Sequence, residues 1–248
     1  IEDIDTARAR ENFVSAIFED LGWLGLRWEM PVLRQSARMD AYRAALARLD
    51  GMGLLYPCFC TRKEIADEIA RASDAPHGPE GALYPGTCRR FSESARTEKI
   101  AAGASYALRL DAHAAANCVG ALSFQEAGAG PCGEHGLIAV DPLLFGDVVL
   151  ARKDTPASYH LAVVVDDAFQ GVNLVTRGND LFAAAHVQRV LQALLELPEP
   201  SYAHHRLILD AQGRKFSKRD KAVTLRHLRD SGASADQVLA LAFGGKVV

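Results

Sequence analysis

The segment at residues 213–220, GRKFSKRD, gathers two lysines and two arginines around one serine and one phenylalanine. The four cations are Arg214, Lys215, Lys218 and Arg219, and the hydroxyl belongs to Ser217. A loop of this composition can close on a triphosphate and neutralise the charge that builds up there during phosphate chemistry. A solvated basic loop has the same composition, so the segment alone leaves both interpretations open.

Three cysteines, Cys58, Cys60 and Cys88, lie in a stretch that is rich in proline and glycine. Structural zinc sites take four tetrahedral ligands and favour thiolates, and a segment with little regular structure gains most from such a cross-link. Candidates for a fourth ligand are Tyr84, His77 and Cys132. Three buried thiols without a metal would leave the same pattern, and the spacing by itself favours neither interpretation.

Acidic residues at the start of the chain form a second candidate site. In the first five residues, IEDID, the acids Glu2, Asp3 and Asp5 follow what the pattern predicts to be the end of a strand. Open α/β sheets bind ligands at such carboxyl ends, so these acids could hold an ammonium group. A helix cap that complements the helix dipole is the alternative, and the five residues alone favour the cap.

A long apolar stretch carries further candidates. Tyr159 precedes the run LAVVVDD at residues 161–167, which lacks alternation and therefore predicts a strand buried on both faces. Arg177 ends the next predicted strand, VNLVTRG at residues 172–178. An arginine in this position could grip a carboxylate with two parallel hydrogen bonds, or pair internally with an aspartate such as Asp180.

The remaining periodicity predicts an α/β fold. Helices are expected at residues 6–21, 36–50, 62–72, 181–196, 221–230 and 234–243, and further strands within 146–154 and at 206–209. Residues 112–136, rich in alanine and glycine, are expected to form loops around a short strand. Strand and helix alternation in both outer parts, with an irregular middle, predicts a Rossmann-like nucleotide fold that carries an insertion.

The composition of the 248 residues is that of a globular protein, with 49% hydrophobic and 24% charged residues. A net charge of −3 argues against a protein that coats nucleic acid through bulk charge but allows local basic patches. No apolar run approaches the ~20 residues of a membrane span. An odd number of cysteines without a visible secretion signal indicates a reducing compartment, so we expect a cytoplasmic protein with no membrane partner.

Taken together, these motifs resemble one family. KFSKR, residues 215–219, resembles the KMSKS signature of class I aminoacyl-tRNA synthetases. IEDID and AVVVDDAFQGVNLVTRGND, residues 162–180, resemble the glutamyl-tRNA synthetase branch. The resemblance is most detailed with the glutamyl-Q tRNA(Asp) synthetase family, short paralogues that attach glutamate to the queuosine base of tRNA(Asp). It covers most of the chain, is weakest across residues 92–140, and depends on the order of the motifs rather than on any one of them.

The resemblance implies a fold and a metal centre. It implies a Rossmann-like class I catalytic domain at residues 1–54 and 141–248, with an inserted zinc-containing, acceptor-type subdomain at residues 55–140. In that family a C-x-C…Y-x-x-x-C pattern holds one structural Zn²⁺ ion, and the matching residues here are Cys58, Cys60, Tyr84 and Cys88.

The resemblance also implies the substrates and their contacts. Glu2 would hold the ammonium group of L-glutamate, and Tyr159 and Arg177 would bind the same substrate, with Arg177 pairing a carboxylate. ATP, accompanied by Mg²⁺, would contact Lys215, Ser217 and Lys218. Lys218 would act as the catalytic residue, because its charge would stabilise the phosphates as glutamyl adenylate and pyrophosphate form.

The acceptor implied by the resemblance is tRNA(Asp) that carries queuosine. Ordinary glutamyl-tRNA synthetases have a large helical domain after the KMSKS loop, whereas only about thirty residues follow Lys218 here. We therefore expect a monomer that seats an anticodon stem-loop where its relatives seat the acceptor stem. Basic residues such as Arg89, Arg90 and Arg214 would supply the phosphate contacts.

One part of the family pattern does not occur in this sequence. Class I synthetases carry a HIGH-like signature in a first strand–helix unit that precedes the segment matched by residues 1–5. We expect residues before Ile1 to supply that unit. The alternatives are a fragment of an ordinary glutamyl-tRNA synthetase, or a non-catalytic relative that binds tRNA or zinc.

Overall fold

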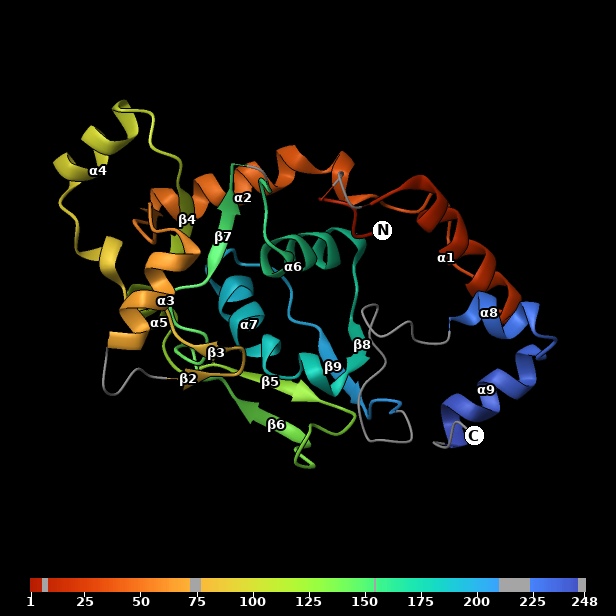
Figure 1. Ribbon diagram of the computed structural model, residues 1–248. Coiled ribbons are helices and arrows are strands. Elements are labelled where there is room, and N and C mark those ends of the chain that lie inside the picture. The colour runs from red at the N-terminus through yellow and green to blue at the C-terminus, as the bar shows by residue number, and fades with distance from the viewer. Residues whose placement is uncertain (6–8, 72–76, 154, 210–223, 245–248) are drawn as a thin grey trace. The chain divides into compact units, whose positions relative to one another are not determined.

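The computed structural model describes residues 1–5, 9–71, 77–153, 155–209 and 224–244, and the chain divides into two compact units (Figure 1). The terminal unit comprises residues 1–37 and 206–248, and the central unit comprises residues 38–205. The boundaries predicted after residues 54 and 140, between a catalytic domain and an inserted subdomain, stay a prediction.

The terminal unit is built from helices at the two ends of the chain. They are α1 at Glu11–Trp23, the 3₁₀ turn η1 at Gln35–Ala37, α8 at Leu225–Asp230 and α9 at Ala235–Gly244. The helices predicted near both ends of the sequence are thereby confirmed for the described residues. Glu19 on α1 accepts hydrogen bonds from Arg226 at 3.1 Å and Arg229 at 3.5 Å, and these bonds tie α1 to α8.

The first five residues form no strand, contrary to the prediction. The Ile1 ammonium group donates to the carbonyl oxygen of Leu33 at 2.6 Å. Asp3 is buried, and its two carboxylate oxygens accept from the Ser36 amide at 2.8 Å and the Ser36 hydroxyl at 2.7 Å. Asp3 therefore holds the chain next to η1, whereas its neighbour Glu2 is exposed.

The central unit contains a mixed four-stranded sheet with the order β6-β5-β9-β8. Its strands are β5 at Ser123–Glu126, β6 at Gly136–Ala139, β8 at Leu174–Gly178 and β9 at Ser201–His205. Strand β9 is parallel to both β5 and β8, and β6 is antiparallel to β5. The carboxyl ends of β5, β9 and β8 consequently meet at one edge. β8 confirms the strand predicted at 172–178. The strand predicted at 206–209 is not formed, because β9 ends at His205 and only Leu209 makes an isolated bridge.

Two smaller sheets complete the central unit. The antiparallel sheet β1-β4-β7 comprises Leu55–Cys58, Ala107–Leu110 and Val149–Arg152. The hairpin β2-β3 pairs His77–Gly78 with Gly81–Ala82. Strand β7 confirms the strand predicted within residues 146–154.

Six α-helices and two 3₁₀ turns are described in the central unit. They are α2 Met39–Gly51, α3 Arg62–Arg71, η2 Thr87–Arg90, α4 Glu93–Ala101, α5 Ala112–Val119, α6 Tyr159–Gln170, η3 Asn179–Leu181 and α7 Ala184–Leu194. The helices predicted at 36–50, 62–72 and 181–196 are confirmed as α2, α3 and α7. Helix α7 covers the four-stranded sheet (Figure 1), where Phe182 and Ala185 pack against Phe124 and Tyr202.

The run at residues 161–167 lies in helix α6, so the prediction of a buried strand is wrong. The Ser158 hydroxyl accepts from the Leu161 amide and caps the helix, which ends at Gly171 with a φ of 66°. Short apolar runs cannot be assigned by periodicity alone, and valine costs a helix only a few tenths of a kcal/mol. Two capping signals and a helical burial pattern therefore outweigh the β-branched composition.

Residues 112–119 form helix α5, which corrects the prediction of loops in this region. The Asp111 carboxylate accepts from the Ala114 amide at 3.0 Å and caps the helix. Alanine is the strongest helix former, so an alanine-rich stretch behind a capping aspartate is stable as a helix. The short strand predicted within the same region is confirmed as β5.

The composition of helices and strands confirms a mixed α/β protein. In the part of the chain that the structure describes, no helix is both long and apolar enough to cross a membrane.

A buried ion pair fastens α6 to α2. Asp166 on α6 is 5% exposed and accepts from Arg38 Nε at 3.1 Å and from the Tyr42 hydroxyl at 2.6 Å. The Arg38 guanidinium also lies 3.8 Å from the centroid of the Phe169 ring. Because a buried carboxylate is costly without such partners, this contact fixes the packing of the two helices.

We expect Asp166→Ala to lower the free energy of unfolding by about 2–4 kcal/mol, because it leaves the buried Tyr42 hydroxyl and the Arg38 charge without their acceptor. Chemical denaturation monitored by circular dichroism measures the change. The control is Asp50→Ala, which removes an exposed carboxylate on α2 and should cost less than about 0.5 kcal/mol. Equal stability of the two variants would contradict this account.

Candidate active site and metal centre

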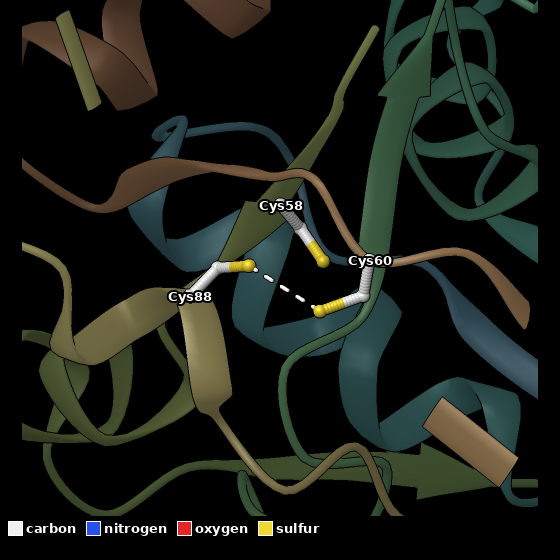
Figure 2. A group of neighbouring side chains, drawn as sticks. All are labelled: Cys58, Cys60 and Cys88. Atoms are coloured by element: carbon white, nitrogen blue, oxygen red, sulfur yellow. Dashed lines mark hydrogen bonds between the residues drawn. The ribbon is translucent and has the colours of Figure 1, made fainter. Parts of the chain in front are cut away.

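The three predicted cysteine ligands come together with Tyr84. Cys58 ends β1, Cys60 follows it and Cys88 lies in η2, and their sulfur atoms all lie within 4.8 Å of one another. Figure 2 shows the three thiols turned toward a common point, with Cys60 Sγ 3.4 Å from Cys88 Sγ. Tyr84 Oη lies 3.4 Å from Cys58 Sγ and 3.6 Å from Cys60 Sγ. The candidates His77 and Cys132 are exposed and do not belong to this group.

These distances match a tetrahedral zinc site. Zn–S bonds of about 2.3 Å and Zn–O bonds of about 2.0 Å separate two sulfurs by roughly 3.8 Å and a sulfur from an oxygen by roughly 3.5 Å. The sulfur–sulfur distance of 3.4 Å and the sulfur–oxygen distances of 3.4 and 3.6 Å lie close to these values. Three sulfurs and one phenol oxygen therefore suit zinc in both chemistry and spacing.

The turn between Tyr84 and Cys88 is shaped by Gly86. Its φ of 79° lies in the left-handed region, and a Cβ there would stand 3.1 Å from Arg89 Nη2. The tight turn allows Tyr84 Oη to accept from the Cys88 amide at 2.9 Å. A larger residue at this position would strain the backbone that brings the two side chains together.

A cation adjoins the cluster and shifts its protonation. The Arg109 guanidinium lies 3.9 Å from the centroid of the Tyr84 ring. Burial raises the pKa of the Cys58 thiol, but hydrogen bonds with Tyr84 and Arg109 outweigh it and leave this pKa below its ordinary value. Burial raises the pKa of Cys60 to about 12. Burial and the hydrogen bond with Cys58 raise the pKa of Tyr84.

Buried Asp147 supports the strands that carry the cluster. Its carboxylate accepts from Arg89 Nη1 at 3.1 Å, from the Ala112 amide at 3.0 Å and from the Tyr56 hydroxyl. Its backbone carbonyl accepts from Arg109 Nη1 at 2.7 Å. One carboxylate therefore joins β1, η2 and the start of α5, and it is an element of the site that the sequence did not reveal.

Arg177 ends in a buried polar network at the carboxyl edge of the four-stranded sheet. Its Nε donates to His204 Nε2 at 3.0 Å, and its Nη1 donates to Gln188 Oε1 at 2.7 Å. His204 Nδ1 contacts Glu126 Oε2 at 2.5 Å, so the imidazole carries its proton on Nδ1. Burial lowers the pKa of His204, and the neutral ring links the charges of Glu126 and Arg177.

One nitrogen of the Arg177 guanidinium has no partner among the described residues. Nη2 is buried and makes no hydrogen bond to any of the described residues. Buried donors are nearly always satisfied, and an exception indicates a ligand or water in the functional protein. The arginine can thus offer a preset donor to an anionic group.

Two aromatic residues, Tyr159 and His160, begin α6. Tyr159 is the first residue of the helix and is half-buried, with its ring centroid 5.5 Å from that of His160. Burial and, to a lesser extent, the charge of Arg177 together lower the pKa of His160 to about 4, so His160 is neutral near pH 7. Tyr159 thus adjoins His160, on which the charge of Arg177 acts.

The remaining predicted site residues lie in the terminal unit or outside the described residues. Glu2 is exposed in the terminal unit. Lys215, Ser217 and Lys218 lie outside the described residues. The polar residues that the sequence did not single out are Glu126, Gln188, His204, Asp147 and Arg109. No local motif marks any of them, because each acts through partners far away in the chain.

Comparison with known proteins supplies the family. The model for tRNA synthetases class I (E and Q), catalytic domain, matches residues 1–241. A glutamyl-Q tRNA(Asp) synthetase of Rhodobacter capsulatus is 45% identical over 97% of this chain and 85% of its own length. Another, from Nocardia farcinica, is also 45% identical, over 97% of this chain and 71% of its own.

A solved structure shares the fold. The crystal structure of a glutamate tRNA ligase from Elizabethkingia meningosepticum, in complex with its amino acid, superimposes with a TM-score of 0.69 at 24% identity. The match covers 89% of this chain and 44% of that chain, which establishes the class I catalytic fold. The chain therefore belongs to the class I tRNA synthetases of the E and Q type, and within them to the glutamyl-Q tRNA(Asp) synthetases.

Proposed function

We propose that the protein activates L-glutamate with ATP and transfers it to the queuosine base in the anticodon loop of tRNA(Asp). The observation that carries this proposal is the similarity, over almost the entire chain, to relatives that bear the name glutamyl-Q tRNA(Asp) synthetase. The reaction takes place in the cytoplasm, where tRNA is modified, and the protein acts as a monomer.

The reaction has two steps, an adenylyl transfer to glutamate followed by transfer of the glutamyl group. A carboxylate oxygen of glutamate attacks the α-phosphorus of ATP, pyrophosphate leaves, and glutamyl adenylate forms. A hydroxyl of queuosine then attacks the carbonyl carbon, and AMP leaves with the bonding electrons. Neither step needs covalent help from the protein, so positioning and charge neutralisation supply the catalysis. Lys218 acts as the catalytic cation on the ATP phosphates, together with Lys215, Ser217 and Mg²⁺.

Arg177 binds a carboxylate of glutamate, with Tyr159 beside it and Glu2 on the ammonium group. The unpartnered Nη2 of Arg177 supports this assignment, since it is a buried donor whose geometry is already fixed by His204 and Gln188. A donor that is oriented before the ligand arrives loses little entropy on binding. Neutral His160 leaves the arginine as the cation that the substrate meets there.

Cys58, Cys60, Tyr84 and Cys88 hold one Zn²⁺ ion. Four protein ligands leave no open position for water, so the ion is structural and fixes the loop-rich segment between β1 and η2. The nearby Arg109 charge offsets part of the negative charge that three thiolates and a phenolate bring to the ion.

We expect the purified protein to contain about one zinc per chain, and Cys88→Ala to lose it, because three ligands bind zinc far more weakly than four. Elemental analysis measures the metal content. Cys118→Ala is the matched control, since it removes an exposed thiol outside the cluster and should retain the ion. Tyr84→Phe removes only the phenol oxygen and should weaken zinc binding. Full zinc content in Cys88→Ala would refute the assignment.

We expect Arg177→Lys to raise the KM for glutamate by roughly ten- to a hundredfold, the effect of losing charged hydrogen bonds, while the KM for ATP changes less than about twofold. Lysine keeps the buried positive charge and so limits damage to the fold. Lys218→Ala should instead lower kcat of glutamate-dependent ATP–pyrophosphate exchange. The full-length protein is assayed without tRNA. Unaltered exchange in Lys218→Ala would show that residues 213–220 do not act on phosphate.

The acceptor is tested with radiolabelled glutamate, ATP and two RNAs. We expect label on tRNA(Asp) that carries queuosine and none on unmodified tRNA(Glu), because the acceptor hydroxyl belongs to the modified base. tRNA(Asp) that lacks queuosine is the matched control and should remain unlabelled. Label on tRNA(Glu) alone would assign the protein to the ordinary glutamyl-tRNA synthetases. If the protein activates glutamate but labels none of the RNAs, the first step of the proposal is supported and the transfer step is refuted.

A further inference from the structure

A basic cleft lies beside the cysteine cluster in the central unit. One cavity of about 670 Å³ is lined by Cys58 and Cys60 and by the side chains of Phe59, Tyr106, Arg152 and Lys153, among others. A second cavity of about 430 Å³ shares Tyr106, Arg152 and Lys153 with it. The two cavities adjoin at these shared residues, and we call the pair of cavities the basic cleft.

The cations of the basic cleft are available to a ligand. Arg62, Arg152 and Lys153 are exposed and line the larger cavity. Across the described ranges of the chain, no residue that lines either cavity is acidic and no carboxylate forms an ion pair with these three side chains. Gathering unpaired cations around a concave surface creates a positive potential that attracts an anion of matching shape. This local charge contrasts with the net charge of −3 of the whole chain.

An aromatic ring completes the cleft. Tyr106 is 37% exposed and lines both cavities. Its ring is held edge-on against Phe59, with centroids 5.8 Å apart, and Phe59 in turn stacks on Phe91 at 6.5 Å. A supported ring with an accessible surface, surrounded by cations, has the composition of sites that stack an unpaired base and bind its phosphates.

The basic cleft leads toward the proposed glutamate site. Arg152 lines a third cavity, of about 350 Å³, that reaches from Tyr84 to His160. His160 is the neighbour of Tyr159 at the start of α6. A single strand of RNA bound at Arg152 would thus extend toward the residues that are proposed to hold the activated amino acid.

We propose that the basic cleft binds a single-stranded segment of the RNA substrate, with phosphates on Arg62, Arg152 and Lys153 and one base stacked on Tyr106. The proposal rests on the proposed function, because it assigns the seat of nucleotides that flank the modified base. An acidic peptide would also meet the cations, but it would leave the exposed tyrosine ring without a flat partner.

The test measures the binding of a fluorescein-labelled RNA hairpin, with the sequence of the anticodon arm of tRNA(Asp), to the full-length protein by anisotropy at several salt concentrations. The double variant Arg152→Gln with Lys153→Gln should raise Kd at least tenfold. It should also reduce the magnitude of the slope of log K against log salt by about 1.4, because each phosphate contact to a single strand contributes about 0.7. Tyr106→Ala should raise Kd roughly five- to a hundredfold without changing the slope.

The matched control is Arg43→Gln with Arg48→Gln on α2. These exposed arginines lie outside both cavities, and each pairs with a carboxylate of its own, Asp40 and Glu196. The control should keep the Kd and the salt slope of the unchanged protein. Zinc content and the melting temperature report whether the variants fold. If the double variant does not fold, Lys153→Gln alone should reduce the slope by about half as much.

Several results would overturn the proposal. A double variant that binds the hairpin with unaltered Kd and slope would do so. A second such result is that the protein binds a labelled poly-glutamate peptide but not the hairpin, and that the double variant loses the peptide. This result would assign the cleft to an acidic protein segment. Glutamate-dependent ATP–pyrophosphate exchange by the unchanged protein involves no RNA, so its absence would refute the proposed function without touching the result for the cleft.

Discussion

The buried positive charge of Arg177 is the constraint around which the four-stranded sheet is organised. A guanidinium that is 9% exposed is stable only if neighbouring groups replace the water it has lost. Those groups come from three other elements: Gln188 on α7, His204 on β9 and, through the histidine, Glu126 at the end of β5. The strand order β5-β9-β8 follows the same sequence as the chain Glu126–His204–Arg177. The sheet and the network therefore specify one another, since a shift of any strand would leave a buried charge unpaired.

This organisation also explains why the carboxyl edge can bind an anion. Glu126 is fully buried and is occupied by His204 and by the amides of Gly128 and His204. Its negative charge is therefore balanced by these donors, and the His204 ring separates it from the Arg177 guanidinium. Arg177 keeps one buried donor, Nη2, that no described residue accepts from. The protein thus fixes the direction of the guanidinium with neutral partners and leaves its charge for a ligand.

Local signals made part of this arrangement predictable from the sequence. Arg177 was correctly expected at the end of a strand, because a β-branched run ends there at a glycine. The helix at residues 161–167 was not predicted, because valine-rich runs of this length fit a buried strand and a buried helix equally well. The signals that decide for a helix are the caps at Ser158 and Gly171. Glu126 and His204 stand 78 positions apart, a separation at which no periodicity reports a contact. The C-x-C spacing likewise left three candidates for the fourth ligand, and only the folded turn at Gly86 brings Tyr84 to the sulfurs.

The two candidate sites of the central unit are mechanically linked by the short segment between β7 and α6. Strand β7 pairs with β4, which in turn pairs with the strand that ends in Cys58. A few residues further along the same chain, Tyr159 begins α6. The sheet next to the cysteine cluster thus positions β7, and the buried Asp166, which fastens α6 to α2, positions α6. Arg109 adds a second connection, because one guanidinium contacts both the Tyr84 ring and the carbonyl of Asp147. A structural metal ion at the cluster would hold Cys58 and Cys60 in place and would thereby fix one wall of the basic cleft. Because β7 is connected to β1 through β4, the ion would also help to fix Arg152 at the end of β7.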